Sequence, residues 1–202
     1  MKKQIATIIL SITLPIIGIW ILSSCNEANF KELTDIPKFE EEMTSEIKKQ
    51  DIAIHFSMQR SFNWVKTKVP TDIKVTLFDS KYKELNYYYF LAFNDWFKKL
   101  KFENGIMPIS SKENLDCDNF AMLYKSLVGI SAYKSEEQSE PAVAVLVVEQ
   151  INEFGGIPAT GGLHMVNLVM TNNGWFIFEP QTGKYTLLER YPNQEYIQYF
   201  IL

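Results

Sequence analysis

Residues 164–179 read HMVNLVMTNNGWFIFE, which is an apolar segment, an Asn-Asn-Gly stretch and a second apolar segment. Asn-Gly between two apolar segments is a strong signal for an antiparallel hairpin. Upstream, residues 142–148 form a short β-branched run that is typical of a buried strand. The C-terminal part of the chain is therefore predicted to form an antiparallel sheet.

Two amphipathic helices are expected before this sheet, because apolar residues recur there at helical spacing. The first helix carries Phe93, Trp96, Phe97 and Leu100 and should end near Gly105 and Pro108. The second begins near Asn114, carries Phe120, Leu123, Tyr124, Leu127 and Val128, and should stop at Gly129. Helices followed by an antiparallel sheet make the predicted class α+β. The aromatic stretch from Tyr87 to Trp96 favours a core face, with a ligand groove as the alternative.

The N-terminus has the pattern of an export signal. Two lysines precede an apolar run that ends at Leu22-Ser23-Ser24-Cys25, which resembles a bacterial lipobox. We expect residues 1–24 to be a lipoprotein signal peptide, 25–50 a lipidated Cys25 with its tether, and 51–202 a single domain. The alternative is an uncleaved transmembrane anchor. Either way the domain is expected outside the cytoplasm, in a bacterial cell envelope, with the membrane as a partner.

The composition of the chain excludes several classes of function. The chain has 202 residues, a net charge of −4, two cysteines and two histidines, and removal of residues 1–24 makes the charge −6. An acidic protein is a poor candidate for nucleic-acid binding, which requires clustered Lys and Arg. So few Cys and His exclude a disulfide framework and leave too few ligands for a nitrogen- or sulfur-based metal site, so no metal and no cofactor are expected.

Cys117 is the first candidate functional residue. It would be the only thiol left once Cys25 carries lipid, and with Asn114 or Asp116 as N-cap it falls in the first turn of the second helix. Unpaired backbone N–H groups and the helix dipole stabilise a thiolate there. Asp116 and Asp118 oppose this effect, so a cationic partner is needed. The alternatives are a buried, inert cysteine and, for Asp116 with Asp118, a contribution to calcium binding.

His164 and Glu179 are the other two candidates. His164 opens the first strand of the hairpin after a glycine-rich loop, and Glu179 closes the second strand. A carboxylate that accepts one ring N–H of a histidine fixes its tautomer and stabilises the imidazolium. Cys117, His164 and Glu179 would then be nucleophile, base and orienting acid. A lone histidine is, however, often an ordinary core or surface residue.

These segments resemble a known superfamily. DCDNFA at 116–121, HMVNLV at 164–169 and FIFEP at 176–180 are similar to the papain-like and transglutaminase-like cysteine hydrolases. Within it, they resemble the bacterial transglutaminase-like cysteine proteinases and the peptidase domain of the Marasmius oreades agglutinin. The resemblance covers roughly residues 85–190. It implies a papain-like or transglutaminase-like fold with Cys117 as nucleophile, His164 as base and Glu179 as orienting acid.

Two departures from the family pattern concern the site. Residues 110–113 lack the glutamine that papain-type enzymes use for the oxyanion hole, which leaves the backbone N–H of Cys117 as one donor. A two-residue turn at Asn173-Gly174 would place Glu179 several residues out of register with His164. A bulge or an earlier turn is then required, and Gln181 is the alternative orienting residue.

The sequence thus predicts a membrane-anchored cysteine peptidase or amidase that works through a thioester on Cys117, with water as the usual acceptor. Its substrates would be peptides or peptidoglycan-like stem peptides, and transfer to an amine would make it a transglutaminase. The competing hypothesis is a catalytically inert lipoprotein that uses the same fold to bind a peptide or a glycan.

Overall fold

The computed structural model describes residues 35–39, 45–48, 50–52, 73–106 and 116–202. The chain divides into two units, residues 1–36 and 37–202, and all that follows concerns the second. The predicted signal peptide, Cys25, His55, Pro108 and residues 110–114 lie outside the described residues. Within the described part, no helix is long and apolar enough to cross a bilayer.

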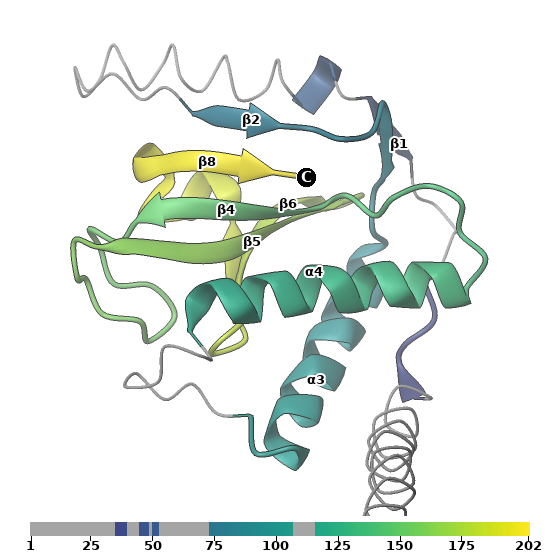
Figure 1. Ribbon diagram of the computed structural model, residues 1–202, viewed down its shortest axis with the longest axis horizontal. Helices are drawn as coiled ribbons and strands as arrows, with labels where there is room; N and C mark the ends of the chain where they lie inside the picture. Colours follow the sequence, from purple (N-terminus) through teal and green to yellow (C-terminus); the bar gives the residue numbers. More distant parts are fainter. Residues whose placement is uncertain (1–34, 40–44, 49, 53–72, 107–115) are drawn as a thin grey trace, which may run out of the picture. The chain divides into compact units, whose positions relative to one another are not determined.

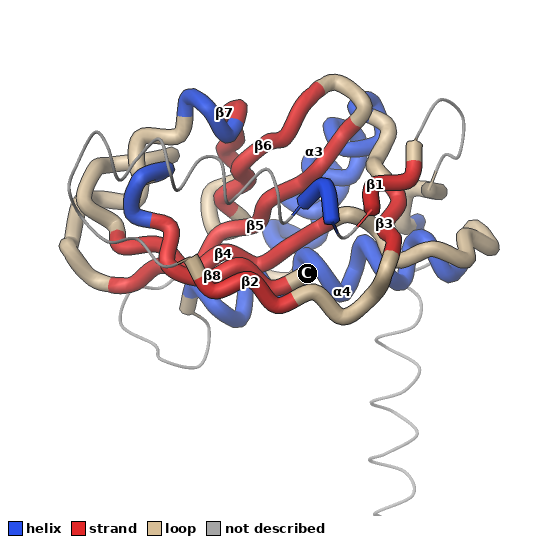
Figure 2. The backbone as a smooth tube through the Cα atoms, turned by 90° about the horizontal axis from the view of Figure 1, so that it is seen from above, coloured by secondary structure: helices blue, strands red, loops and turns tan. Residues whose placement is uncertain are grey.

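The core of the fold is a six-stranded sheet with the order β2-β8-β4-β5-β6-β7 (Figures 1 and 2). Its strands are β2 (Lys74–Thr76), β4 (Val143–Glu149), β5 (Leu163–Thr171), β6 (Gly174–Glu179), β7 (Lys184–Leu187) and β8 (Ile197–Ile201). All neighbouring pairs are antiparallel except β2 with β8, which is parallel. β4 and β5, the strands with the most continuous apolar sequence, occupy the middle, where both faces are covered.

Short strands precede the helices, which corrects the simple order of helices first and sheet second. β1 (Glu46–Lys48) lies inside the predicted tether and pairs with β3 (Lys81–Lys83) in a separate two-stranded sheet. Segments so short carry little periodic signal, and β2 is exposed along its whole length. The α+β class predicted from the sequence is confirmed.

Two helices pack on one face of the six-stranded sheet, α3 (Tyr87–Glu103) and α4 (Cys117–Lys134) (Figures 1 and 2). Asn86 caps α3 by accepting from the backbone N–H groups of Tyr88 and Tyr89. α4 runs through Gly129 and ends at Lys134, which corrects the predicted stop. Its last turns are held by tertiary packing, because Ser131 is fully buried and accepts from the Tyr89 hydroxyl at 2.8 Å.

Aromatic rings fill the space between the helices and the sheet. The Tyr124 ring of α4 lies 4.4 Å from that of Phe178 on β6 and makes edge contacts with Phe93 and Phe97 of α3. The Tyr124 hydroxyl donates to Asn94 at 2.7 Å. The aromatic stripe of α3 is therefore mainly core, as periodicity favoured.

The opposite face of the sheet carries a second apolar layer. Ile177, Leu168 and Leu146 belong to one buried cluster with Leu188 and Phe200. Leu188 starts η3 (Leu188–Arg190), a short helix that is followed by η4 (Gln194–Tyr196) before β8. The sheet is thus covered on both sides.

Candidate functional site at Cys117, His164 and Glu179

Cys117 is the first residue of α4 and is half-buried. Asp116, one of the two N-caps that the sequence offered, caps the helix, and its backbone N–H donates to the Asn119 side chain at 3.4 Å in a capping box. A hydrogen bond with Asp118, together with burial and the Asp118 charge, raises the pKa of Asp116. Asp118 therefore interacts with its acidic neighbour at the helix start.

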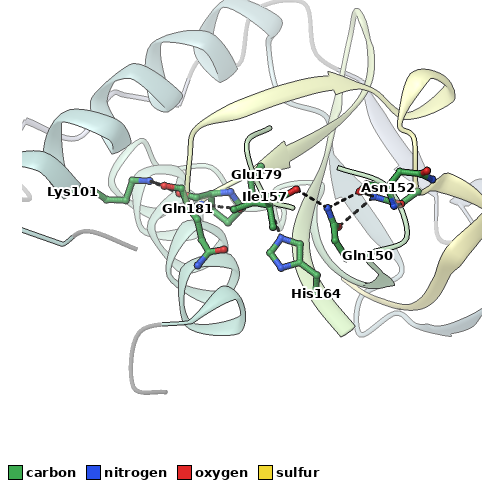
Figure 3. Close-up of polar contacts among 9 residues, drawn as sticks. Lys101, Gln150, Asn152, Ile157, His164, Glu179 and Gln181 are labelled. Atoms are coloured by element: carbon green, nitrogen blue, oxygen red, sulfur yellow. Dashed lines mark hydrogen bonds and ion pairs between the residues drawn. The ribbon is translucent and has the colours of Figure 1, made fainter. Parts of the chain in front are cut away.

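His164 and Glu179 are brought together at the ends of two adjacent strands (Figure 3). His164 Nε2 lies 2.6 Å from Glu179 Oε2, and their exposed fractions are 7% and 0%. The second carboxylate oxygen accepts from the backbone N–H of Gln181 at 2.9 Å. Gln181 therefore contributes its backbone to hold Glu179, the residue that bonds the histidine ring.

The hairpin register explains how this contact forms. Thr171 pairs with Gly174, so the two-residue turn is Asn172-Asn173 and lies one residue earlier than the Asn173-Gly174 turn considered from the sequence. Continuing this register places Gln181 opposite His164, with Glu179 two residues away on the same side of the strand. Diagonal neighbours of this kind are within reach of long side chains. An earlier turn was one of the two solutions that the sequence left open.

The surroundings of His164 favour its protonated form. Burial alone disfavours the imidazolium, but hydrogen bonding to Cys117 and Glu179, and the charges of both, outweigh it and raise the pKa of His164 to about 9. Because Nε2 is bonded to Glu179, Nδ1 is the ring nitrogen left for the thiol. Chemically, a cysteine beside a protonated, oriented histidine is a thiol that can be held as a thiolate in an ion pair.

An amide network orders the loop between β4 and His164. The Gln150 side chain donates to the carbonyl of Asn152 at 2.9 Å and accepts from Asn193 at 3.3 Å (Figure 3). Asn193 in turn accepts from the backbone N–H of Asn152 at 2.7 Å. Gln150 and Asn193 are both buried. The glycine-rich segment that leads into β5 is therefore tied to the chain before η4, which fixes the start of the strand that carries His164.

Comparisons with known proteins give a likeness in fold. No family model matches the sequence, and no curated protein matches it either. A structure described as the PSL1a–E64 complex superposes with a TM-score of 0.50 at 18% identity, over 78% of this chain and 50% of that one. A Polyporus squamosus lectin bound to a sialylated epitope gives 0.41 at 18% identity, over 72% and 48%. The chain spans about half the length of these proteins.

This finding overturns the prediction that the chain is a cysteine peptidase or amidase. The neighbours are lectins, and at 18% identity the likeness is one of fold, so it gives no ground for a cysteine peptidase class in this chain. The enzyme class was inferred from three residue types in a familiar order. Buried polar side chains are hydrogen-bonded in folded proteins whether or not they are catalytic. The contact between the histidine and the carboxylate therefore does not by itself establish catalysis.

Sequence reasoning missed Lys101, which is the one buried lysine among the described residues. Its ammonium group donates to the carbonyl of Pro180 and, at 2.8 Å, to that of Gln181. The only signal was its place one turn after Phe97 on the buried side of α3. Among the described residues there is no group of three Cys, His, Asp or Glu side chains suited to hold a metal ion.

Proposed function

We propose that the protein is a glycan-binding protein of a bacterial cell envelope, exported and anchored through a lipid on Cys25. Its domain is proposed to be a papain-like or transglutaminase-like variant of the α+β fold that is used for binding. The fold likeness to PSL1a supports this proposal. Because this chain spans half of that one, sugar binding needs support from residues of this chain as well.

That support is a tyrosine patch, which we define as Tyr87, Tyr88 and Tyr185. Exposed fractions of 73% for Tyr88 and 40% for Tyr185 distinguish them from the other rings of this region, which are mostly core. Tyr87 starts α3, and Tyr185 lies on the edge strand β7. Burial, the charge of Tyr185 and a hydrogen bond between the two phenols raise the pKa of Tyr87. The two hydroxyls therefore meet at the surface.

Packing holds the Tyr87 and Tyr185 rings in fixed positions. Tyr87 stacks on Phe176 at 5.3 Å between centroids, and Tyr185 makes edge contacts with Phe90 at 5.4 Å and with Phe176 at 6.0 Å. A rigid aromatic ring that carries a hydroxyl offers an apolar face for the C–H face of a sugar and a polar edge for its hydroxyls, at little entropic cost. The exposed, preorganised tyrosine patch is the observation that carries the proposal.

The direct test is a glycan array probed with the full chain in detergent, with N-acetyllactosamine derivatives and peptidoglycan disaccharide-peptides among the ligands. Replacement of both Tyr88 and Tyr185 by alanine should weaken binding of the best ligand at least tenfold. Phe102→Ala is the matched control, because Phe102 is 75% exposed at the other end of the same helix. No binding to any glycan, or binding that survives the double replacement, would contradict the proposal.

A second binding function is favoured by a separate observation, the complex of PSL1a with E64. We propose that the Cys117 and His164 side chains also bind a small ligand of this kind. The Tm of the full chain should rise when E64 is added, and the rise should disappear in both Cys117→Ala and His164→Ala. An unchanged Tm in the wild-type chain would reject this second function and leave the tyrosine patch unaffected.

The anchor has its own test. Cells expressing the protein and fed a palmitate analogue should label the wild-type chain and not Cys25→Ala. Labelling that persists in Cys25→Ala would reject lipidation at this residue.

A further inference from the structure

We propose that Lys101 is a positioning residue that aims the Glu179 carboxylate at His164 by holding the two carbonyl groups that follow Glu179 in the chain. This inference concerns the organisation of the buried polar site and does not depend on which ligand the protein binds. It rests on the contacts of the Lys101 ammonium group, its burial and the position of the turn it binds.

The Lys101 side chain reaches from the last turn of α3 to residues 180–181 (Figure 3). Both hydrogen bonds go to backbone carbonyls, those of Pro180 and Gln181. The Gln181 N–H in turn donates to Glu179 Oε1, and Oε2 faces His164. One ammonium group thus fixes the peptide units that present a hydrogen-bond donor to the carboxylate.

Burial of an ammonium group is costly and needs compensation. Lys101 is 6% exposed, and its Nζ lies 5.1 Å from the ring centroid of Phe97 and 5.3 Å from that of Phe120. Burial lowers the pKa of Lys101 to about 8, and the negative charge of Glu179 opposes that shift. A methionine or leucine would fill the same apolar slot at lower cost. The charge of Lys101 in this apolar position is explained by the two carbonyl groups that it binds and by the nearby Glu179 carboxylate.

Helix α3 also contacts the turn after Glu179 at Gly183. Gly183 has φ +79°, and a Cβ at this position would lie 2.3 Å from Lys98 Cε. The Gly183 N–H donates to the Glu179 carbonyl at 2.7 Å. The aliphatic stem of Lys98 lies against Gly183, and the Lys98 side chain is 42% exposed. It therefore serves as a control lysine on the same helix, one turn from Lys101.

The charged and titratable groups around the His164–Glu179 pair come from four segments. They are Lys98 and Lys101 on α3, Cys117 on α4, Glu179 on β6 and Tyr191 after η3. If Lys101 acted on His164 only through its charge, removing that charge would leave the Glu179 carboxylate uncompensated. The titration midpoint of His164 would then rise. Loss of positioning has the opposite sign, because a carboxylate that turns away stops stabilising the imidazolium.

The experiment is an NMR titration of the histidine ring protons of the full chain, which has only two histidines, with the His164 signal assigned from His164→Asn. Lys101→Met should lower the midpoint of His164 by about one unit or more, whereas Lys101→Arg and Lys98→Met should leave it near the wild-type value. A midpoint that stays or rises in Lys101→Met would overturn the proposal.

A double replacement separates positioning from general structural damage. If Lys101 acts through Glu179, Lys101→Met should change the His164 midpoint no further once Glu179 is glutamine. An additional fall of the same size in the Glu179→Gln background would overturn the proposal. Should Lys101→Met fail to fold, Lys101→Arg carries the test, because a guanidinium that holds both carbonyls must keep the midpoint.

Discussion

His164 Nε2 and Glu179 Oε2 lie 2.6 Å apart across the β5–β6 hairpin, although the two residues are diagonal neighbours and not direct cross-strand partners. Both are buried, and each is a hydrogen-bond partner of the other's polar end. This one contact fixes the tautomer of the histidine and makes the protonation of the site a property of the pair.

Glu179→Gln should therefore lower the His164 titration midpoint well below about 9, because the amide keeps the shape of the carboxylate and loses its charge. The free energy of unfolding at pH 6 should fall by about 1–3 kcal/mol. Urea unfolding gives the energy, and the histidine ring protons give the midpoint. An unchanged midpoint would show that the carboxylate is not what stabilises the imidazolium.

Stability should depend on pH through the same histidine. The folded-state pKa of His164 is raised to about 9 above the ordinary 6.5, so its contribution is complete below pH 6.5 and is lost as the pH rises toward 9. Between pH 6.5 and 8 the loss amounts to about 2 kcal/mol. Lys101, with its pKa lowered to about 8, is half deprotonated only at the upper end of that window, so it offsets a small part of the loss. His164→Asn should flatten the urea-unfolding profile, and an equally steep profile in that variant would count against this assignment.

The aromatic core between the helices and β6 predicts a large packing effect. Phe178 is fully buried and touches rings from both helices, so Phe178→Ala should destabilise the fold by about 3–5 kcal/mol. Phe102→Ala, at an exposed site, should stay within about 0.5 kcal/mol of wild type. Similar losses for the two variants in chemical denaturation would show that the ring cluster is not the core described here.

The helix cap predicts a smaller effect. Asp116→Ala removes the N-cap of α4 and should cost about 1 kcal/mol of stability, whereas Asp116→Asn should cost little, because asparagine caps equally well. The comparison is made by denaturation at neutral pH. Equal losses in both variants would indicate that charge, and not capping, is what Asp116 contributes.

Local patterns carried much of this structure. The β-branched run predicted at 142–148 forms β4 (Val143–Glu149), the periodic apolar faces form α3 and α4, and Asp116 is one of the two N-caps that the sequence offered. The helix end at Lys134 was missed because tertiary contacts of Ser131 outweigh the local cost of Gly129.

For the site too, local sequence patterns predicted some features, whereas features that depend on long-range contacts were missed. Cys117, His164 and Glu179 were identifiable as residue types at the ends of elements, but the register that joins His164 to Glu179 depends on a one-residue shift of the turn. Lys101 escaped notice because its partners are carbonyl groups some eighty residues away. The enzyme class failed for a further reason, since a constellation of side chains specifies a chemistry only together with the ligand it receives.

The most direct test of the proposed binding function measures glycan binding and peptide turnover on the same preparation of the full chain. We predict a saturable glycan affinity that falls at least tenfold when Tyr88 and Tyr185 are both alanine, and no release of product from peptide substrates by the wild-type chain. Absence of glycan binding together with peptide hydrolysis that is lost in Cys117→Ala would contradict the account.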